Sequence, residues 1–589
     1  MVLFETINKL SNLKSRQGVA GGGAKRLFVP PSTHYPLFRY GYEDDERSFL
    51  SIDERVNSLN AGDESDINSV STSRSLPSTL DSNEDRRSFH TWLLEERGPR
   101  YMEDEDRDWQ SVSNLEDQDS KLSISLSYDI YDDFVNLETN YSIEFYMLLK
   151  SAIPLVLTLL MEHITSVITL IAVGHLGKQE IAAATMGFMA LTVTFGIFEG
   201  IATALDTLTP QAYGSGNHEL VSIYVQSSII LSLLIYLPCC LIWWKALFIL
   251  KYVIQNEEVI RMTSQYLKVL VFGGPPYIFF QCGKRFLQAQ GIFEAGTGIL
   301  FVSAPIHAVV SWALVWSRNW GLGFVGAPIA LTLNYWLMAS LLVLYVRFVD
   351  GSECWQGIAP FRNLLHEWGP LFSLGVPGVI MLESEFVAYE LMTLLASYLG
   401  TIELAAQSAV LSSASLTYMI AFALSIAAST RIGSFLGGQN IHSAKIAART
   451  SLIAALLAAL LNAFFLFLFK RELAKLFTQD PEVTDLVTRL FGSVVAVVQL
   501  FDGTASVASG ILRAQGRQKI GGMINLVSYY AIAFPLAVLF SFYYNFSVFG
   551  LWMALGFGML LIGCSETVII FLSDWDKIIL DSEAILSSS

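Results

Sequence analysis

Seven carboxylic acids stand inside long apolar stretches of the sequence, where a charged side chain is costly. One charged residue at the centre of a membrane helix costs about 2.5–3.5 kcal/mol on insertion scales. Acids in such places are therefore candidate functional groups, and few basic residues accompany them. An acidic set of this kind suits the binding of cations and protons. The seven are Glu162, Asp206, Glu383, Glu385, Glu390, Asp502 and Glu566.

A carboxyl group in apolar surroundings can switch between a proton and a cation. Desolvation disfavours its ionised form, so the group is poised to hold or release a proton near neutral pH. The ionised form accepts a cation, whereas the protonated form does not. Occupancy by one therefore excludes the other, which is the requirement for exchanging the two across a membrane.

Glu385 is the first candidate for this switch. It stands in the apolar stretch that opens the second half of the chain, and an internal repeat superimposes it on Glu162. Two carboxylates are therefore expected in symmetry-related positions. Glu390 follows Glu385 by five residues, roughly 140° around a helix, so the two cannot share one narrow face. One is expected to face a cavity while the other braces a neighbouring helix.

Three other acids have two interpretations each. Asp502, in the string FDGTAS, is either a second cation or proton site or a partner in a helix–helix hydrogen bond. Asp206 precedes Pro210, so its carboxylate either caps the break in the helix or faces the cavity, and the cap is favoured slightly. Glu383 lies about 200° from Glu385 around the helix, which leaves a structural role and a cavity role equally open.

Aromatic residues accompany the acids, again with two interpretations. They either line a pocket for flat organic cations through attraction to the ring face, or belong to the interfacial belt and to helix packing, which is the commoner role. His163 adjoins Glu162, and a histidine in this setting is most often hydrogen-bonded to a neighbour. The aromatic candidates are Tyr277, Tyr389, Trp312 and Trp336.

Membrane helices must position these groups. Hydrophobic residues make up 53% of the 589 residues, and apolar stretches of about 20 residues, long enough to cross a bilayer, recur from Met147 to Phe571. This pattern excludes a soluble enzyme. About twelve spans are predicted, near 147–174, 181–206, 221–244, 262–288, 295–317, 323–348, 369–398, 403–433, 445–469, 484–512, 519–543 and 548–572.

The two halves of this region are copies of each other. A shift of about 223 residues superimposes four landmarks without a gap, and after a two-residue slip LQAQG at Leu287 matches LRAQG at Leu512. Because each copy holds an even number of spans, the halves should be related by a pseudo-twofold axis along the membrane normal, with the binding site between them. The landmark pairs are Pro154 and Pro377, Leu176-Gly177 and Leu399-Gly400, Glu180 and Glu403, and Asn217 and Asn440.

The fold expected is therefore an all-α polytopic membrane protein of two pseudo-symmetric six-helix bundles, preceded by a polar tail. Up to Asn140 we count 27 acidic and 15 basic residues and no sustained apolar period, which predicts disorder. Five segments are expected: a cytoplasmic tail (1–140), an N-lobe (141–350), a cytoplasmic inter-lobe loop (351–368), a C-lobe (369–573) and a short C-terminal tail (574–589).

Two features of the tail suggest contacts. Residues 2–14 either form a short amphipathic helix on an anionic membrane surface or are a solvated leader, which is the simpler interpretation. Arg74-Ser75 and Arg86-Arg87-Ser88 place hydroxyls beside basic residues, as basophilic kinases require, so kinases are possible partners of the tail.

Four strings of this sequence resemble recurrent patterns of the multidrug and toxic compound extrusion (MATE) family, in its eukaryotic and fungal-like branch. The strings lie in both halves, and the resemblance extends from about Pro154 to Gly521. In that branch the seventh span carries an acid, an aromatic pair and a second acid five positions on, as Glu385 and Glu390 stand here, although Phe386-Val387 replaces the pair. The strings are ALDTLTPQAYGSG from Ala204, KRFLQAQG from Lys284, STRIGSFLGGQN from Ser429, and FDG followed by ILRAQGRQKIG from Phe501.

The resemblance implies a V-shaped pair of six-helix bundles that exports organic cations, xenobiotics or metabolites in exchange for protons or sodium, with the proton role carried by Glu385. It implies no cofactor beyond the coupling ion, no nucleic-acid partner, a monomer in a lipid bilayer, and a vacuolar or plasma membrane with both termini cytoplasmic. Sodium coupling, a lipid-type translocator and a non-transporting sensor stay open as alternatives. A membrane enzyme is disfavoured because paired histidines, a GxSxG string and a phosphate-binding loop are missing from the sequence.

Overall fold

The computed structural model confirms an all-α architecture in the part of the chain that it describes. Within that part, eleven helices are long and apolar enough to cross a membrane. The expected tail, including residues 2–14 and both kinase motifs, lies outside the described residues except for its last two positions. The described ranges are 139–252, 256–319, 321–478 and 480–588.

The N-lobe is built from long helices with short breaks. It contains α5 (Tyr141–Gly174), α6 (Lys178–Ala202), α7 (Leu205–Gly214), α8 (His218–Trp244), α9 (Ala246–Leu250), α10 (Glu257–Leu270), α11 (Gly274–Ala289), α12 (Glu294–Trp316), the 3₁₀ turn η2 (Gly323–Val325) and α13 (Gly326–Phe348). The short helix α14 (Phe361–His366) lies in the expected inter-lobe loop.

The fourth expected span, 262–288, is two helices and not one. The helical hydrogen-bond ladder is interrupted between α10 and α11, because Pro275 and Pro276 occupy the first turn of the new helix and cannot donate to the preceding carbonyls. Side chains satisfy the carbonyls that the break exposes: Tyr236 Oη donates to Val271 O at 2.9 Å, and Trp336 Nε1 donates to Phe272 O at 3.1 Å. A broken helix is tolerated in a membrane protein when its polar backbone is satisfied in this way.

The C-lobe repeats the plan, with π-helical turns in two of its spans. Such turns are often found at functional sites. Its helices are α15 (Trp368–Leu399), α16 (Thr401–Gly437), α17 (Ile441–Leu468), α18 (Lys470–Phe477), α19 (Pro481–Leu490), η3 (Phe491–Val495), α20 (Ala496–Ala514), α21 (Gln518–Leu526), η4 (Val527–Ala533), α22 (Phe534–Val538), η5 (Leu539–Tyr543) and α23 (Ser547–Phe571).

The internal repeat is visible in matching helix starts. Asn217 caps α8 by accepting a hydrogen bond from the amide of Leu220, and Asn440 caps α17 by accepting one from the amide of Ser443. The two caps and their donors differ by the same 223 positions as the sequence repeat. An asparagine cap satisfies an amide that the helix itself leaves without an acceptor, so the same local chemistry starts the third span of each lobe.

The lobes are joined where repeat-equivalent segments cross. α7 of the N-lobe packs on the last third of α16, and a Cβ atom at Gly214 would overlap the carbonyl oxygen of Ser434. The equivalent Gly437 has the reciprocal relation with Gln211, whose number is 223 below that of Ser434. Reciprocal contacts of this kind place the pseudo-twofold axis at the crossing, which needs glycine on both sides.

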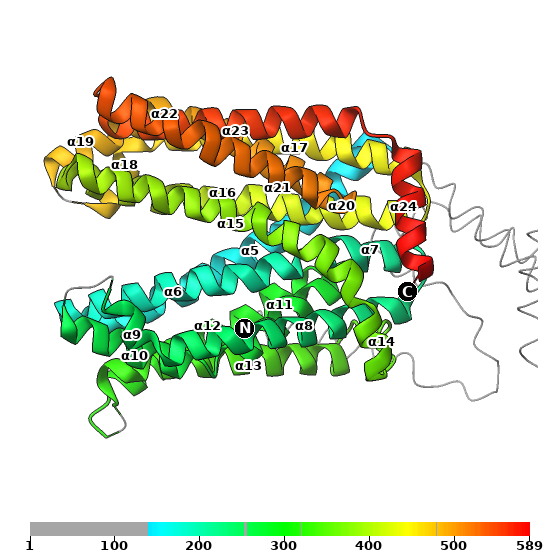
Figure 1. Ribbon diagram of the computed structural model, residues 1–589, viewed down its shortest axis with the longest axis horizontal. Helices are drawn as coiled ribbons and strands as arrows, with labels where there is room; N and C mark the ends of the chain where they lie inside the picture. Colours follow the sequence, from blue (N-terminus) through cyan, green and yellow to red (C-terminus); the bar gives the residue numbers. More distant parts are fainter. Residues whose placement is uncertain (1–138, 253–255, 320, 479, 589) are drawn as a thin grey trace, which may run out of the picture. The chain divides into compact units, whose positions relative to one another are not determined.

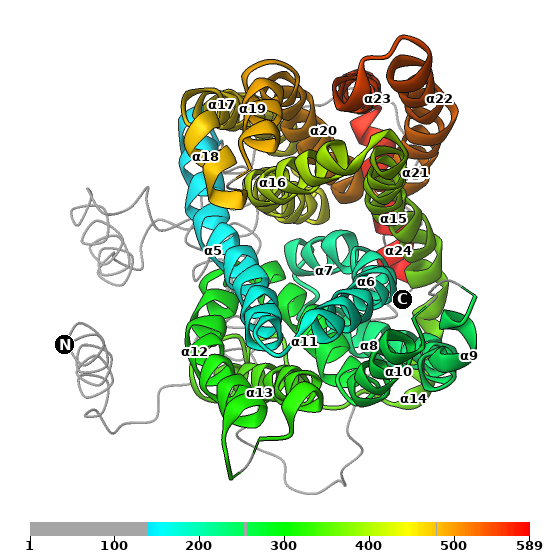
Figure 2. The ribbon, with the colours of Figure 1, turned by 90° about the vertical axis from the view of Figure 1, so that its left-hand side faces the viewer.

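α5 passes from one lobe to the other, as Figures 1 and 2 show. Its start is tied to the C-lobe, where Arg431 Nε donates to Glu144 Oε2 at 2.8 Å. Its end is tied to the N-lobe, where Thr169 Oγ1 lies 3.0 Å from His307 Nε2 and Trp316 Nε1 donates to Ala172 O. The first span therefore belongs to both bundles.

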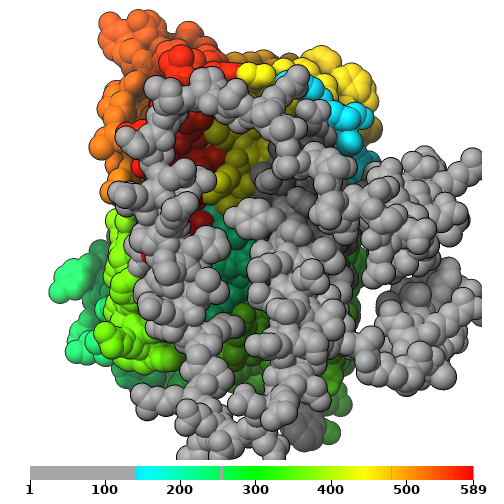
Figure 3. Space-filling model, turned by 90° about the vertical axis from the view of Figure 1, so that its right-hand side faces the viewer, coloured from blue at the N-terminus to red at the C-terminus, as the bar shows by residue number. Residues whose placement is uncertain are grey.

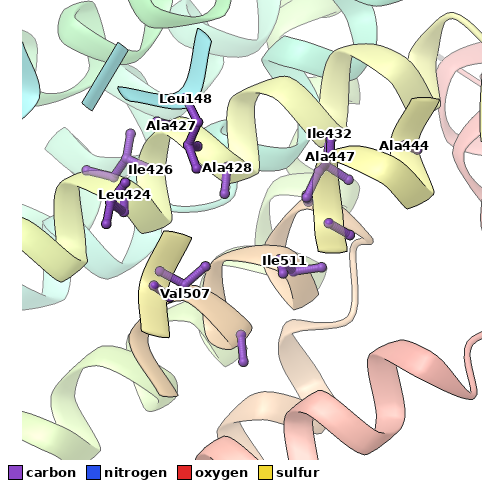
Figure 4. Close-up of a cluster of buried hydrophobic side chains, with 14 of the residues drawn as sticks. Leu148, Leu424, Ile426, Ala427, Ala428, Ile432, Ala444, Ala447, Val507 and Ile511 are labelled. Carbon is purple, nitrogen blue, oxygen red and sulfur yellow. The ribbon is translucent and has the colours of Figure 1, made fainter. Parts of the chain in front are cut away.

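Small side chains dominate the apolar core around the end of α16. Figure 4 shows residues of α5, α16, α17 and α20 converging there, among them Ala427 and Ala428 of α16 and Ala444 and Ala447 of α17. Within a bilayer the helices gain little from hydrophobic burial alone, so close packing of small residues is the main source of association. This core fixes α20, which carries Asp502.

A helix replaces the short C-terminal tail that the sequence predicted. α24 (Trp575–Ser588) buries Trp575, Ile578 and Ile579 against the C-lobe core, and Ser582 Oγ donates to Gln211 Oε1 of the N-lobe at 2.9 Å. Figure 1 shows α24 at the same end of the bundles as the start of α5, and Figure 3 views that end. The two ends of the described chain thus lie together.

Candidate functional site

A cavity of about 440 Å³ lies between the lobes and is lined by three of the seven acids that the sequence singled out. Glu162 of α5 lines it from the N-lobe, and Glu385 and Glu390 of α15 line it from the C-lobe. A fourth carboxylate, Glu199 of α6, also lines it. Its volume is within the usual range for small-molecule sites, and its charged groups come from both halves of the duplication.

Sequence reasoning missed Glu199, although the signal was present. The residue stands in the predicted span 181–206, which is otherwise apolar around it, and meets the criterion that selected the other acids. It lies within electrostatic reach of Glu162, Asp206, Lys284 and Arg285. The N-lobe wall of the cavity therefore carries two acids and not one.

Aromatic and sulfur-containing side chains form most of the apolar lining. Tyr277 and Tyr389 line the cavity as one interpretation expected, and Tyr277 stacks on Phe195 at 4.0 Å between ring centroids. Trp312 and Trp336 are exposed and lie outside the lining, as belt residues do. The other aromatic lining residues are Phe188, Tyr335, Phe386, Tyr418 and Phe422, with Met338 and Met419 beside them.

Glu385 sits on a stretch of α15 whose backbone is held from a neighbouring span. Asn525 Nδ2 donates to Met381 O at 3.0 Å, and Tyr530 Oη donates to Ser384 O at 3.0 Å. The carboxylate itself accepts a long contact of 3.5 Å from Tyr418 Oη. The bonds to the backbone fix the position of Glu385 while its own oxygens keep capacity for a ligand.

A second, small cavity of about 20 Å³ extends from Glu385 into the C-lobe. Asp502 lines it, together with Ser509 and Arg513 of the same helix. A volume of this size holds about one water molecule between polar groups. Neither Glu385 nor Asp502 forms an ion pair with a basic side chain in the described ranges, and Asp502 accepts a long hydrogen bond of 3.5 Å from Gln499 Nε2.

Glu162, the repeat partner of Glu385, differs from it in having an ion-pair partner. Lys284 Nζ of α11 lies 2.6 Å from Glu162 Oε1 in an ion pair whose lysine is 7% exposed. The expectation that the intramembrane acids have few basic partners is therefore wrong for this residue. The lysine stands in the quoted string KRFLQAQG, near the end of a predicted span, and its importance depends on a contact across 122 residues of chain.

Asp206 also has basic partners, and it lies outside both cavities. Arg285 Nε donates to its Oδ1 at 2.9 Å, and Arg513 Nε of the C-lobe lies 3.8 Å from its Oδ2. The carboxylate thus joins the lobes near the α7–α16 crossing, where Ser429 Oγ also donates to the Asp206 carbonyl. The favoured prediction of a cap on the broken helix is wrong, because the carboxylate pairs with arginines from two other spans.

The remaining three acids occupy separate places. Glu390 also lines the central cavity and is exposed. The expectation that one of Glu385 and Glu390 faces the cavity while the other braces a neighbouring helix is therefore wrong, because the cavity is wide enough to be lined by both. Glu383 lines neither cavity. Glu566 of α23 is fully buried and accepts a hydrogen bond from Ser509 Oγ at 2.8 Å, which leaves its other oxygen without a partner in the described residues.

These features define a duplicated helical membrane protein with a ligand-sized, acid-lined cavity between its halves. The family model for MatE matches residues 154–313 and 377–539, one match in each lobe. The chain belongs to the MATE family of transporters. It is an integral, multi-pass membrane protein.

Fungal and animal relatives support this assignment. An uncharacterized transporter of Saccharomyces cerevisiae is 43% identical over 74% of this chain, a match that spans 62% of the relative's own length. A second, from Schizosaccharomyces pombe, is 38% identical over 80% of this chain and 86% of the relative. Multidrug and toxin extrusion protein 1 of Danio rerio is 31% identical over 75% of this chain and 74% of its own.

Solved structures agree with the fold. The crystal structure of the eukaryotic MATE transporter AtDTX14 superimposes with a TM-score of 0.71 and 27% identity, over 76% of this chain and 100% of that one. A MATE family transporter of the MOP superfamily in an outward-facing conformation gives a TM-score of 0.67 at 16% identity, over 75% of this chain and 97% of that one. The latter supports the architecture alone.

Proposed function

We propose that this transporter exports organic cations, xenobiotics or metabolites in exchange for protons, with Glu385 as the group that carries the proton. The observation that supports it most is the contrast around the cavity: Glu385 reaches the cavity without an ion-pair partner among the described residues. The aromatic lining adds ring faces that attract a flat cation, at about 0.5–2 kcal/mol each.

The chemistry follows from exclusive occupancy. When Glu385 is ionised, its charge and the surrounding rings hold a cation in the cavity. A proton that reaches the carboxyl group removes that charge, so the cation loses its counter-charge and leaves. Asp502 shares the small second cavity with Glu385, so a water molecule there would connect the two carboxyl groups. Proton uptake and cation release are then the two sides of one step.

Alternating access requires that one end of the lobes be closed while the other is open. Hydrogen bonds between the lobes cluster at the end that bears α24, where Thr207 Oγ1 donates to Arg513 O and Gln211 Nε2 donates to Ala514 O. Breaking this set and forming contacts at the far end would open the cavity to the other side. With both termini cytoplasmic, the conformation described would face away from the cytoplasm.

The membrane, the oligomeric state and the tail belong to the same proposal. An acidic far side exists at the vacuolar and at the plasma membrane, and both fit a proton-driven exporter. We propose a monomer, because each chain carries a complete cavity of its own between its two lobes. Phosphorylation of the tail by basophilic kinases would adjust its contacts through added negative charge.

Purified protein in acid-loaded proteoliposomes tests the proposal. A small organic cation such as tetraethylammonium is added outside, in potassium buffer with valinomycin, and internal pH is followed with a dye. We expect cation-dependent proton release that Glu385→Gln abolishes. Glu383→Gln is the matched control, since Glu383 stands two residues away and lines neither cavity, and it should keep the release.

Three outcomes would contradict this proposal. Release that survives in Glu385→Gln would move the proton site elsewhere. Cation exchange that needs a sodium gradient, with no response to pH, would show sodium coupling. Lack of any response over a broad panel of cations would favour a lipid-type translocator or a sensor.

A further inference from the structure

The repeat allows the surroundings of Glu162 and Glu385 to be compared position by position. A shift of 223 residues pairs these two acids. In the helix that faces each of them, the shift is 225 residues, as the matching strings at Leu287 and Leu512 show. With that shift, Lys284 of the N-lobe corresponds to Ser509 of the C-lobe.

Lys284 forms an ion pair with Glu162, whereas Ser509 forms none with Glu385. In the N-lobe the ammonium group of Lys284 is 2.6 Å from Glu162 and 5.4 Å from the centroid of the Phe280 ring. In the C-lobe the short hydroxyl of Ser509 donates to Glu566, and Glu385 keeps no ion-pair partner in the described part of the chain. One acid is neutralised by its own protein, and the other is available.

We propose that Lys284 is a built-in cation that occupies the N-lobe counterpart of the coupling site and so keeps Glu162 from exchanging protons. The C-lobe is then the lobe that couples proton movement to transport. This inference rests on the proposed function and goes beyond it, because it assigns Lys284 the control of how many protons move with each cation.

The position of Lys284 supports this role. The Lys284 side chain is 7% exposed and the Glu162 side chain 24%, so water screens the pair only in part, and such a close pair is stronger than one on a surface. Protonating Glu162 would leave a buried ammonium group without its partner, which is costly. Lys284 therefore withholds Glu162 from the exchange.

The groups around Glu162 define what removal of the lysine would do. With serine at position 284, Glu162 would face Glu199 across the cavity wall, and Arg285 is already paired with Asp206. Two neighbouring carboxylates with fewer cations cannot both stay ionised, so one takes up a proton. The charged and titratable groups near Glu162 are His163, Glu199, Tyr277, Lys284, Arg285 and Tyr335, with Glu385, Glu390, Tyr389 and Tyr418 on the C-lobe wall.

The test is a null-point measurement of coupling in proteoliposomes. With the voltage clamped at zero, the cation gradient that stops net flux at a fixed pH difference gives the number of protons exchanged per cation, independently of transport rate. We expect Lys284→Ser to raise this number by about one, so that one pH unit sustains a cation gradient about tenfold larger. The double variant Lys284→Ser with Glu162→Gln should return to the wild-type number.

Further variants keep the proposal testable if Lys284→Ser folds poorly. Glu162→Gln with Lys284→Met removes both charges together, a change that is often tolerated in buried pairs, and it should keep the wild-type number of protons. A lower number in that variant would show that Glu162 already carries a proton and would overturn the proposal. So would a wild-type number in folded Lys284→Ser.

The proposed function and this inference can be separated in the same experiment. If wild-type protein moves no protons when the cation is added, the proposed function fails, and the inference fails with it. If the wild type moves protons and Lys284→Ser leaves the number unchanged, only the inference fails.

Discussion

The two lobes have the same helical plan and different electrostatics. In the N-lobe, Glu162 is paired with Lys284. In the C-lobe, the equivalent Glu385 shares a small cavity with Asp502, and the lysine position is Ser509. The acid therefore occupies equivalent positions in the two lobes. The residue on the facing helix differs, and in our proposal this difference, Lys284 or Ser509, sets whether the acid can bind a ligand.

The tyrosine and aspartate positions reinforce the contrast. The same alignment pairs Tyr277 of the N-lobe with Asp502 of the C-lobe. It also pairs Phe195 of the N-lobe with Tyr418 of the C-lobe. Tyr277 stacks on Phe195, whereas the Tyr418 hydroxyl contacts Glu385. The N-lobe thus presents ring faces where the C-lobe presents a hydroxyl and a second carboxylate. Both lobes supply carboxylates to the cavity, but the second carboxylate beside Glu385 has an aromatic ring as its counterpart beside Glu162.

The largest effect on proton-coupled uptake is expected when a lysine is placed at the C-lobe position that corresponds to Lys284. Ser509→Lys combined with Glu566→Gln, which removes the acid that Ser509 contacts, would place an ammonium group where Lys284 stands in the N-lobe. Pairing of that group with Glu385 should reduce proton-coupled uptake to the background of empty vesicles. The added side chain is larger, and overpacking costs about 1–3 kcal/mol. Size-exclusion profiles must therefore match those of wild type. Full coupling in this double variant, once it is shown to be well folded, would show that a basic partner for Glu385 is unimportant.

Removing the second carboxylate of the C-lobe should have an intermediate effect. Asp502→Asn keeps the shape of the side chain and its contact with Gln499 but removes one acid from the small cavity. We expect the maximal transport rate to fall about tenfold, which corresponds to about 1.4 kcal/mol, near the upper end for one ordinary hydrogen bond. Initial rates at saturating cation measure it. A helix–helix hydrogen bond alone would instead lower thermal stability and leave the rate per folded molecule unchanged.

The smallest effect on transport is expected from a change at Glu390. Glu390 is exposed, so its charge attracts cations from solution without holding them. Glu390→Gln should raise the apparent KM two- to fivefold, an order-of-magnitude expectation for one screened charge, and should leave the proton number unchanged. The loss should shrink as salt rises, which uptake at two ionic strengths can verify. A changed proton number would place Glu390 in the coupling step.

The sequence predicted the helices and the duplication well, because hydropathy and register are properties of neighbours along the chain. It also predicted that Glu162 and Glu385 are equivalent, but it placed only one of Glu385 and Glu390 at the cavity, whereas both line it. The ion pair of Lys284 with Glu162 was not predicted, since it joins residues 122 positions apart and hydropathy carries no information on such contacts. The same reason applies to Asp206 and its two arginines.

The sequence also contains local patterns for α24 and for the break between α10 and α11. Trp575, Ile578 and Ile579 follow the i, i+3, i+4 spacing of an amphipathic helix, which predicts α24 from the sequence. The pair Pro275-Pro276 predicts a helix start inside the fourth span. The prediction of a short C-terminal tail and of one span over 262–288 used neither pattern, because it rested on hydropathy.

The central claim is that proton coupling passes through the C-lobe acid and not through its N-lobe counterpart. The most direct measurement compares cation-driven proton release from acid-loaded proteoliposomes for Glu385→Gln and for Glu162→Gln combined with Lys284→Met, at matched amounts of folded protein. We expect the first variant to release no protons above background and the second to release them as wild type does. Release that persists in the first, or is lost in the second, would contradict the claim.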